Sequence, residues 1–211
     1  KFSGQFYVKG YYNSNYELND NDASDAYMTM RLRVQTDFLV SDNLSLTTRF
    51  DALDNKRWCD SDNPPGAGND NIDWDRAYMT IKTDLGTFST GRMSGGSWGT
   101  LFNDTEGERD RIKYAKSFGG LTLLAIYEKN AEGDEGNLVS DQDFDVYYLA
   151  PYYKMENMSF GVLVGWVLNK SVSSQEDNYF AVVPYFTGQF GPFGLQGEVR
   201  YNGFGDRDYD D

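Results

Sequence analysis

Residues 26–54 read AYMTMRLRVQTDFLVSDNLSLTTRFDALD, and polar and apolar side chains alternate through most of this stretch. Between residues 26 and 40 the even positions are mainly apolar, as at Met28, Leu32 and Phe38, whereas the odd positions are mainly polar or charged. Successive side chains of a β-strand point to opposite faces, so this stretch predicts a long strand with one apolar and one polar face. The alternation resumes at Leu44, after three polar residues, which predicts a hairpin of two long strands.

The same alternation recurs along the chain and predicts about eleven strands. They lie at residues 2–12, 26–40, 44–54, 73–84, 87–93, 110–118, 121–130, 143–154, 158–169, 178–190 and 193–204. Several of them are about 10–13 residues long, whereas strands of soluble sheets are most often about 5–6 residues long. A tilted strand needs about 9–11 residues to cross a bilayer.

Short and long connections alternate between these strands. Short turns lie at residues 41–43, 84–86, 119–120, 156–157 and 191–192, and long polar segments lie at 13–25, 55–72, 94–109, 131–142 and 170–177. Bacterial outer-membrane barrels have short periplasmic turns and long extracellular loops. The sequence therefore predicts an all-β fold, a transmembrane antiparallel β-barrel in a bacterial outer membrane, whose acidic loops face outside.

The composition excludes several classes of protein. The 211 residues include no His and one Cys, which argues against His-dependent hydrolases, most catalytic zinc sites and disulfide scaffolds. A formal charge of −14 argues against a nucleic-acid partner, because such proteins must neutralise phosphates. We therefore expect no enzyme activity, no catalytic residue, no cofactor and no metal.

Residues 73–92 read DWDRAYMTIKTDLGTFSTGR, and Trp98, Gly99 and Phe102 follow in the next segment. An aromatic–acid–Arg–small–Tyr strand, a Leu-Gly turn and a short strand ending in Gly-Arg resemble the general bacterial porins. The motif covers residues 73–102, and the strand pattern extends the resemblance over the whole chain. It implies a sixteen-stranded, homotrimeric diffusion channel surrounded by lipid and lipopolysaccharide. Eleven strands are fewer than that, so we expect one barrel domain over 1–211 that lacks its C-terminal strands.

Several basic residues are predicted to line the pore. Arg31, Arg33 and Arg49 lie on the polar faces of their strands, and an arginine facing lipid at the bilayer midplane costs about 2–4 kcal/mol. The same argument extends the basic set to Arg76, Arg92, Arg111 and Lys113, although Gly91 leaves the direction of Arg92 open. Pairing of the arginines with Asp37 or Asp51 as structural bridges is the alternative.

The resemblance also assigns a role to the segment 94–109. In general porins the corresponding loop folds into the barrel and narrows it, which implies a constriction with Asp104, Glu106 and Glu108 opposite the arginines. Asp60, Asp62, Asp70 and Asp73 carry oxygen ligands that Ca²⁺ accepts, but they lack a ligand-loop spacing and are expected to be solvated. Cys59 is expected to be an inert thiol.

Three functions are compatible with these patterns. The first is passive diffusion of small hydrophilic solutes and ions through a porin. The second is a substrate-specific channel or a scaffold barrel around a partner, and the third is a secreted carbohydrate-binding β-sandwich. Strands apolar on both faces, as around Val162–Val164, do not fit a wholly polar lumen and leave room for the second. Aromatic residues near predicted strand ends, such as Tyr12, Trp74 and Phe190, favour a membrane barrel.

Overall fold

The structure is a computed structural model that describes residues 1–14, 24–58, 72–100, 102, 107–133, 142–170 and 177–203. These residues form one antiparallel sheet of twelve strands. No helix in the described part of the chain is both long and apolar enough to cross a membrane.

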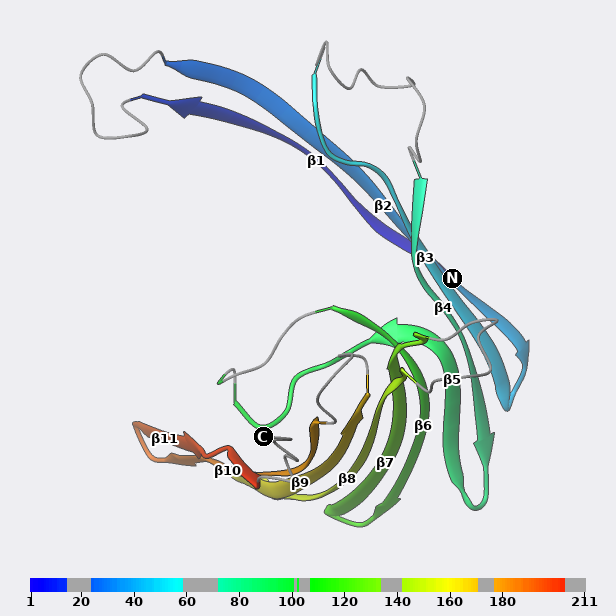
Figure 1. Ribbon diagram of the computed structural model, residues 1–211, viewed down its shortest axis with the longest axis vertical. Helices are drawn as coiled ribbons and strands as arrows, with labels where there is room; N and C mark the ends of the chain where they lie inside the picture. Colours follow the sequence, from blue (N-terminus) through cyan, green and yellow to red (C-terminus); the bar gives the residue numbers. More distant parts are fainter. Residues whose placement is uncertain are drawn as a thin grey trace, which may run out of the picture. The chain divides into compact units, whose positions relative to one another are not determined.

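The strands follow one another in the sheet in the order of the sequence, from β1 to β11, and β12 pairs with β10 (Figure 1). Their bounds are β1 Phe2–Asn13, β2 Asp25–Ser41, β3 Leu44–Arg57, β4 Ile72–Thr83, β5 Gly86–Ser94, β6 Glu108–Phe118, β7 Leu121–Ala131, β8 Phe144–Lys154, β9 Met158–Asn169, β10 Asp177–Phe190, β11 Phe193–Glu198 and β12 Tyr201–Gly203. All eleven predicted strands are confirmed, with ends that differ by a few residues.

The predicted strand 193–204 is divided into β11 and β12. Both pair with β10, and the division at residues 199–200 lies opposite Pro184, whose carbonyl accepts a hydrogen bond of 3.1 Å from the Val199 amide. Proline has no amide hydrogen to donate, so the regular ladder is interrupted at this point of the edge. The count therefore rises from eleven strands to twelve.

The predicted closure of the sheet into a barrel is not observed. Among the described residues β1 pairs with β2, and β11 and β12 pair with β10, but no strand joins the two ends of the order. A barrel requires its last strand to pair with its first. The structure therefore establishes an antiparallel sheet and leaves the barrel as a proposal.

The chain divides into two compact units. The first unit comprises residues 1–40 and 45–77, and the second comprises residues 41–44 and 78–211. In the first unit β1 and β2 pair along their whole length, so that Tyr7 lies opposite Arg31 and Phe6 lies opposite Leu32. The first pair belongs to what we call the polar face of this unit, and the second pair to its apolar face.

The second unit contains the consecutive pairings from β5 to β11. We call its two sides the covered face, which includes Arg111, Glu128 and Val146, and the exposed face, which includes Tyr127 and Tyr147. In Figure 1 these strands form one curved sheet, and the green segment that follows β5 crosses its concave side.

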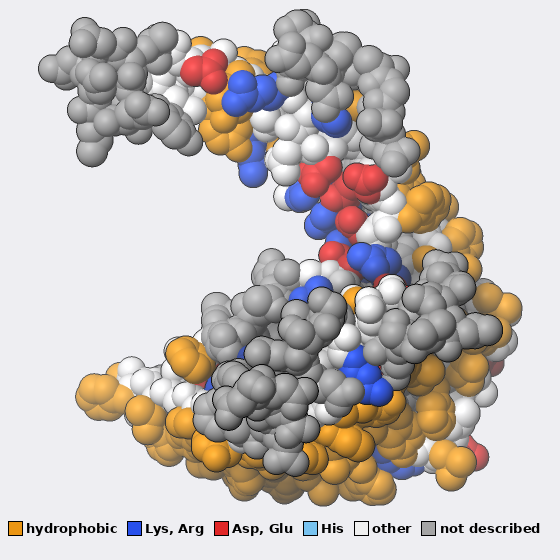
Figure 2. Space-filling model, viewed as in Figure 1, with side chains coloured by type: hydrophobic (Ala, Val, Ile, Leu, Met, Phe, Trp, Pro, Cys, Tyr) orange, Lys and Arg blue, Asp and Glu red, His pale blue; other side chains and the backbone are white. Residues whose placement is uncertain are grey.

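Several polar or charged side chains are buried, while many large apolar side chains are exposed. The buried polar or charged residues are Thr29, Thr36, Thr47, Arg49, Asp51, Ser89 and Glu128, whereas large apolar residues such as Leu32, Leu149 and Phe180 are about half exposed. Figure 2 shows the hydrophobic side chains gathered along the convex side of the second unit. Soluble proteins bury such side chains and expose charged ones.

Candidate functional site

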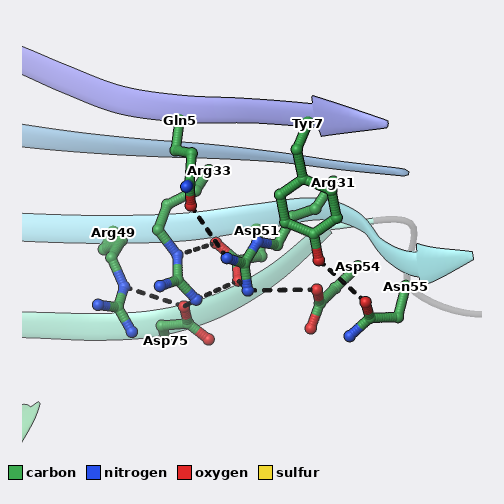
Figure 3. Close-up of polar contacts among 9 residues, drawn as sticks. All are labelled: Gln5, Tyr7, Arg31, Arg33, Arg49, Asp51, Asp54, Asn55 and Asp75. Carbon is green, nitrogen blue, oxygen red and sulfur yellow. Dashed lines mark hydrogen bonds and ion pairs between the residues drawn. The ribbon is translucent and has the colours of Figure 1, made fainter. Parts of the chain in front are cut away.

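A network of arginines and aspartates covers the polar face of the first unit (Figure 3). Its centre is the pair of Arg33 on β2 and Asp51 on β3. Arg33 Nε donates to Asp51 Oδ1 at 2.6 Å, and Arg33 Nη2 donates to Asp51 Oδ2 at 2.5 Å. This two-point geometry is the strongest form of an arginine–carboxylate contact. The Asp51 side chain is only 3% exposed, so its charge depends on this pairing.

Asp75 extends the network to a third strand. Its Oδ2 atom lies 2.9 Å from Arg49 Nε and 3.3 Å from Arg33 Nη2, so one carboxylate bridges two arginines. The Arg49 side chain is 9% exposed. The negative charge of Asp75 lies between the guanidinium groups of Arg33 and Arg49 and offsets the repulsion between them.

Arg31 completes the basic row on β2. Its Nη1 atom lies 3.5 Å from Asp54 Oδ1 and 3.7 Å from Asp51 Oδ2, and its Nη2 atom donates to Gln5 at 3.1 Å. The guanidinium also lies over the Tyr7 ring, 4.9 Å from its centroid. The ring quadrupole attracts a cation in this position.

The backbone of β3 is irregular next to this network. Leu53 and Asn55 have φ angles of 56° and 54°, which are uncommon for residues other than glycine. In a regular strand Asp54 and Asp51 would point to opposite faces, yet both reach Arg31. The irregularity redirects Asp54 to the polar face, where Asn55 also accepts a hydrogen bond of 2.9 Å from Tyr7.

Three arginines and three aspartates therefore neutralise one another on this face. The structural-bridge alternative is confirmed for Asp51, whereas Asp37 accepts a hydrogen bond from Thr47 instead. Strand alternation predicts that Arg31, Arg33 and Arg49 lie on the polar faces of their strands. It does not predict which acids they pair with. The signal that sequence reasoning missed is the acid content at Asp54 and Asp75, which also pair with these arginines.

A second charged group lies on the covered face of the second unit. Arg111 Nε lies 2.5 Å from Glu128 Oε2, and Arg109 Nε lies 3.4 Å from Glu128 Oε1. The Glu128 side chain is 4% exposed. Lys113 follows Arg111 on the same face of β6, where it pairs in register with Ser89 on β5 and Ile126 on β7.

Two of the predicted pore residues differ from this set. Arg92 lies opposite Asp110, with its Nη1 atom 2.9 Å from Asp110 Oδ2, and this pair shares the face of Ile112 rather than that of Arg111. The prediction that Arg92 joins the other arginines is therefore wrong by register. Both charges are about half exposed at the end of β5, where they need no burial. Arg76 is half-buried on β4 and is engaged by neighbouring groups.

The segment after β5 lies against the covered face. Trp98 Nε1 donates to the Val183 carbonyl at 2.9 Å, and its ring meets Tyr185 edge-on with centroids 5.0 Å apart. The amide and the hydroxyl of Thr100 each donate to Glu198 Oε2 at 2.8 Å. At its start, the carbonyl of Gly95 accepts a hydrogen bond of 2.5 Å from Arg111.

This segment explains why several strands are apolar on both faces. On β8, β9 and β10 the covered face carries five buried apolar residues: Val146, Ala150, Val167, Ala181 and Val183. Trp98 contacts this area through Val183, Tyr152 and Tyr185. An apolar patch beneath a folded-back segment forms a small core, so polar residues are not required there.

The remaining loop predictions are only partly described. Asp104 and Glu106 lie outside the described residues, as do Cys59, Asp60, Asp62 and Asp70. Glu108 is the first residue of β6, opposite Ser94, so the connection spans residues 95–107 rather than 94–109. Asp73 is exposed on β4, and the described residues contain no group of three or more potential metal ligands.

A smaller ion cluster lies where β7 ends and β8 approaches. Lys129 contacts Glu132 at 2.7 Å and also pairs with Asp143. The hydrogen bond from Lys129 lowers the pKa of the Asp143 carboxyl below its ordinary value. Exposed ion pairs add little stability, so this cluster serves mainly to order the ends of the two strands.

The exposed face of the second unit carries two aromatic rows. In the first row, four residues are cross-strand neighbours with ring centroids 5.2, 6.0 and 5.9 Å apart: Tyr127, Tyr147, Trp166 and Phe180. The second row, near the short turns, contains Tyr153, Phe160 and Phe186. The residues between the rows include Ala125, Leu149, Val164 and Val182.

An aliphatic band between two aromatic rows is the pattern of a surface that meets lipid. Sequence reasoning expected aromatic residues near strand ends, but it missed the first row because only the register aligns the four strands.

No protein-family model matches the chain, and no curated protein matches it significantly in sequence. The resemblance to general porins rests on residues 73–102 and on the strand pattern, and it stays a prediction.

Replacing Asp51 with asparagine should destabilise the fold strongly. The Asp51→Asn side chain keeps its shape but removes the two-point contact and leaves Arg33 with Asp75 alone at 3.3 Å, so a loss of about 2–3 kcal/mol is expected. Asp54→Asn is the matched control, because Asp54 is 37% exposed and its contact with Arg31 is longer, so about 0–1 kcal/mol is expected. Urea unfolding followed by tryptophan fluorescence measures both, and equal small losses would contradict this role of Asp51.

Replacing Glu198 with alanine should release the segment around Thr100. A hydrogen bond to a charged group contributes about 1.5–3 kcal/mol, so exchange of the Thr100 amide hydrogen should accelerate about tenfold or more. Gln196→Ala is the control, because Gln196 lies on the same face of β11, two residues away. Hydrogen exchange read by mass spectrometry gives both rates, and an unchanged rate in Glu198→Ala would show that other contacts hold the segment.

Proposed function

We propose that this chain contributes strands to the wall of a β-barrel channel in a bacterial outer membrane, through which small hydrophilic solutes and ions diffuse. The observation that carries the proposal is the reversed sorting of side chains. Charged residues such as Asp51 and Glu128 are buried, while the opposite sides of the same strands expose large apolar residues.

The exposed apolar side chains are more stable in an apolar environment than in water. At roughly 25 cal/mol per Å² of apolar surface, leaving so many side chains in water is unfavourable. Contiguous apolar surface of this kind marks an interface with lipid or protein. The two aromatic rows with aliphatic residues between them favour lipid, because tyrosine and tryptophan concentrate at the membrane–water boundary.

Backbone hydrogen bonding in a bilayer also limits the form that the sheet can take. A bilayer offers no hydrogen bonds to the backbone, so only helices and closed barrels span it. We propose that the sheet closes through further strand pairing at β1 and at the β11–β12 edge. The resemblance of residues 73–92 to general porins supports sixteen strands and a homotrimer as the finer form of this proposal.

In each unit, the proposed lumen side is the face that carries the buried charges: the polar face of the first unit and the covered face of the second. Arg31, Arg33 and Arg49 supply one charged wall, and the segment 95–100 lies across the covered face of the second unit. A segment held inside a channel reduces its width, and the fixed charges select among the solutes that pass.

A substrate-specific channel is the second candidate. Its support is the aromatic character of the covered face, where Tyr148 and Tyr152 lie on β8 and Tyr179 and Tyr185 lie on β10, with β9 between them. Aromatic rings combine apolar surface with a hydroxyl, which suits solutes such as sugars.

Reconstitution into a planar bilayer tests the proposal. Detergent-purified protein should produce discrete current steps whose size rises linearly with salt concentration, and it should migrate faster on a detergent gel before heating than after. A current that saturates with one solute would favour the second candidate. Protein that stays soluble without detergent and carries no current would overturn the membrane assignment.

Replacing Leu149 with arginine should distinguish lipid from water on the exposed face. Leu149 is 50% exposed between the two aromatic rows, and an arginine facing the bilayer midplane costs about 2–4 kcal/mol. Leu85→Arg is the matched control, because Leu85 is 75% exposed in the turn between β4 and β5, where about 0–0.5 kcal/mol is expected. Urea unfolding from lipid vesicles gives both values, and equal effects would mean that Leu149 faces water.

A further inference from the structure

Charge is balanced on one part of the proposed lumen and unbalanced on another. In the first unit, Arg31, Arg33 and Arg49 are matched by Asp51, Asp54 and Asp75. On the covered face of β6 and β7, Glu128 pairs with both Arg109 and Arg111. Lys113 lies on the same face of β6, next along the strand from Arg111.

The two arginines on the covered face of β6, Arg109 and Arg111, both contact the Glu128 carboxylate. Both carboxylate oxygens of Glu128 are taken, Oε1 by Arg109 and Oε2 by Arg111. Arg111 donates in addition to the carbonyls of Ser94 and Gly95, and its side chain is 11% exposed. Its charge is thus compensated and largely shielded.

Lys113 differs from both arginines. Among the described residues, its ammonium forms no ion pair and no hydrogen bond, although the residue is half-buried. Its cross-strand neighbours on this face are Ser89 and Ile126, neither of which carries a charge. A cation removed in part from water, with no counter-charge, attracts a mobile anion.

The neighbouring hydroxyls add a second donor. Ser89 is buried at 6% exposure, and its Oγ lies 3.0 Å from Thr80 Oγ1 in a hydrogen bond that either hydroxyl can donate. Two hydroxyl groups that share one hydrogen bond retain one hydrogen for a further acceptor. Ser89 is directly opposite Lys113 in the register, so the hydroxyl pair and the Lys113 side chain share this face.

We propose that Lys113, with the Ser89–Thr80 hydroxyl pair, forms a binding subsite for small oxyanions on the covered face. An oxyanion has several acceptor oxygens, which suits an ammonium with three donors and an adjacent hydroxyl. The balanced arginines of the first unit do not serve this purpose. As a lumen site this subsite rests on the proposed channel, where it would favour anionic solutes.

Binding of inorganic phosphate tests the subsite directly. Detergent-solubilised protein in low salt is titrated calorimetrically with phosphate, using the unaltered chain and Lys113→Met. The affinity should fall about tenfold or more in this variant, and Lys113→Arg, which keeps the charge, should retain most of it. Ser89→Ala should lose affinity by a smaller factor, which a mere change in net charge would not produce.

Lys116→Met is the matched control. Lys116 lies on the same strand but on the opposite face, where its ammonium donates to the Asp84 carbonyl. Its substitution removes the same charge and should change phosphate affinity by less than about twofold. Equal losses in Lys113→Met and Lys116→Met, or unchanged binding in Lys113→Met, would overturn the subsite.

Ion selectivity separates this inference from the proposed function. In a bilayer with a KCl gradient, Lys113→Met should shift the reversal potential toward potassium selectivity, and Lys116→Met should not. Phosphate binding that depends on Lys113 in a protein without conductance would support the subsite and overturn the channel. Conductance whose selectivity and phosphate binding ignore Lys113 would support the channel and overturn the subsite.

Discussion

The pair formed by Arg33 and Asp51 illustrates the constraint on which the polar face of the first unit depends. A charged side chain removed from water needs a compensating charge, and the two-point contact at 2.5 and 2.6 Å supplies it. Asp75 pairs with Arg49 through a single contact of 2.9 Å, and Asp54 lies 3.5 Å from Arg31. Successive side chains of a strand point to opposite faces, so the apolar residues between the charged ones lie on the other face.

In the second unit, a segment of the chain rather than a set of ion pairs covers one face of the sheet. Its covered face is apolar over β8–β10, and the segment bearing Trp98 and Thr100 lies against it instead of a second sheet. One tryptophan, with a ring contact and a hydrogen bond to a backbone carbonyl, anchors the segment near its middle. Glu198 holds it further along, and Arg111 holds its start. Both units expose large apolar residues on the opposite face, which is the physical basis of the channel proposal.

Much of the fold was predictable from residue order. Alternation at residues 26–54 and its recurrence located eleven strands, the last of which the structure divides into β11 and β12. The side of five basic residues followed from their positions: Arg31, Arg33, Arg49, Arg111 and Lys113. Arg92 was misplaced because Gly91, with a φ of 120°, leaves the alternation ambiguous. The row formed by Tyr127, Tyr147, Trp166 and Phe180 could not be foreseen, because it depends on the register of four strands and not on any one of them.

The sequence by itself determined the strands, their two-sided character and the polar side of most basic residues, since these depend on local backbone geometry with a period of two. Only the tertiary structure decided which acids meet which bases. Asp54 reaches Arg31 through an irregular backbone at Leu53, and Glu128 is shared by two arginines, so that Lys113 is left as the cation beside two hydroxyls. These pairings join residues that are 17–42 positions apart in the chain, and they arise from register, which no single strand encodes.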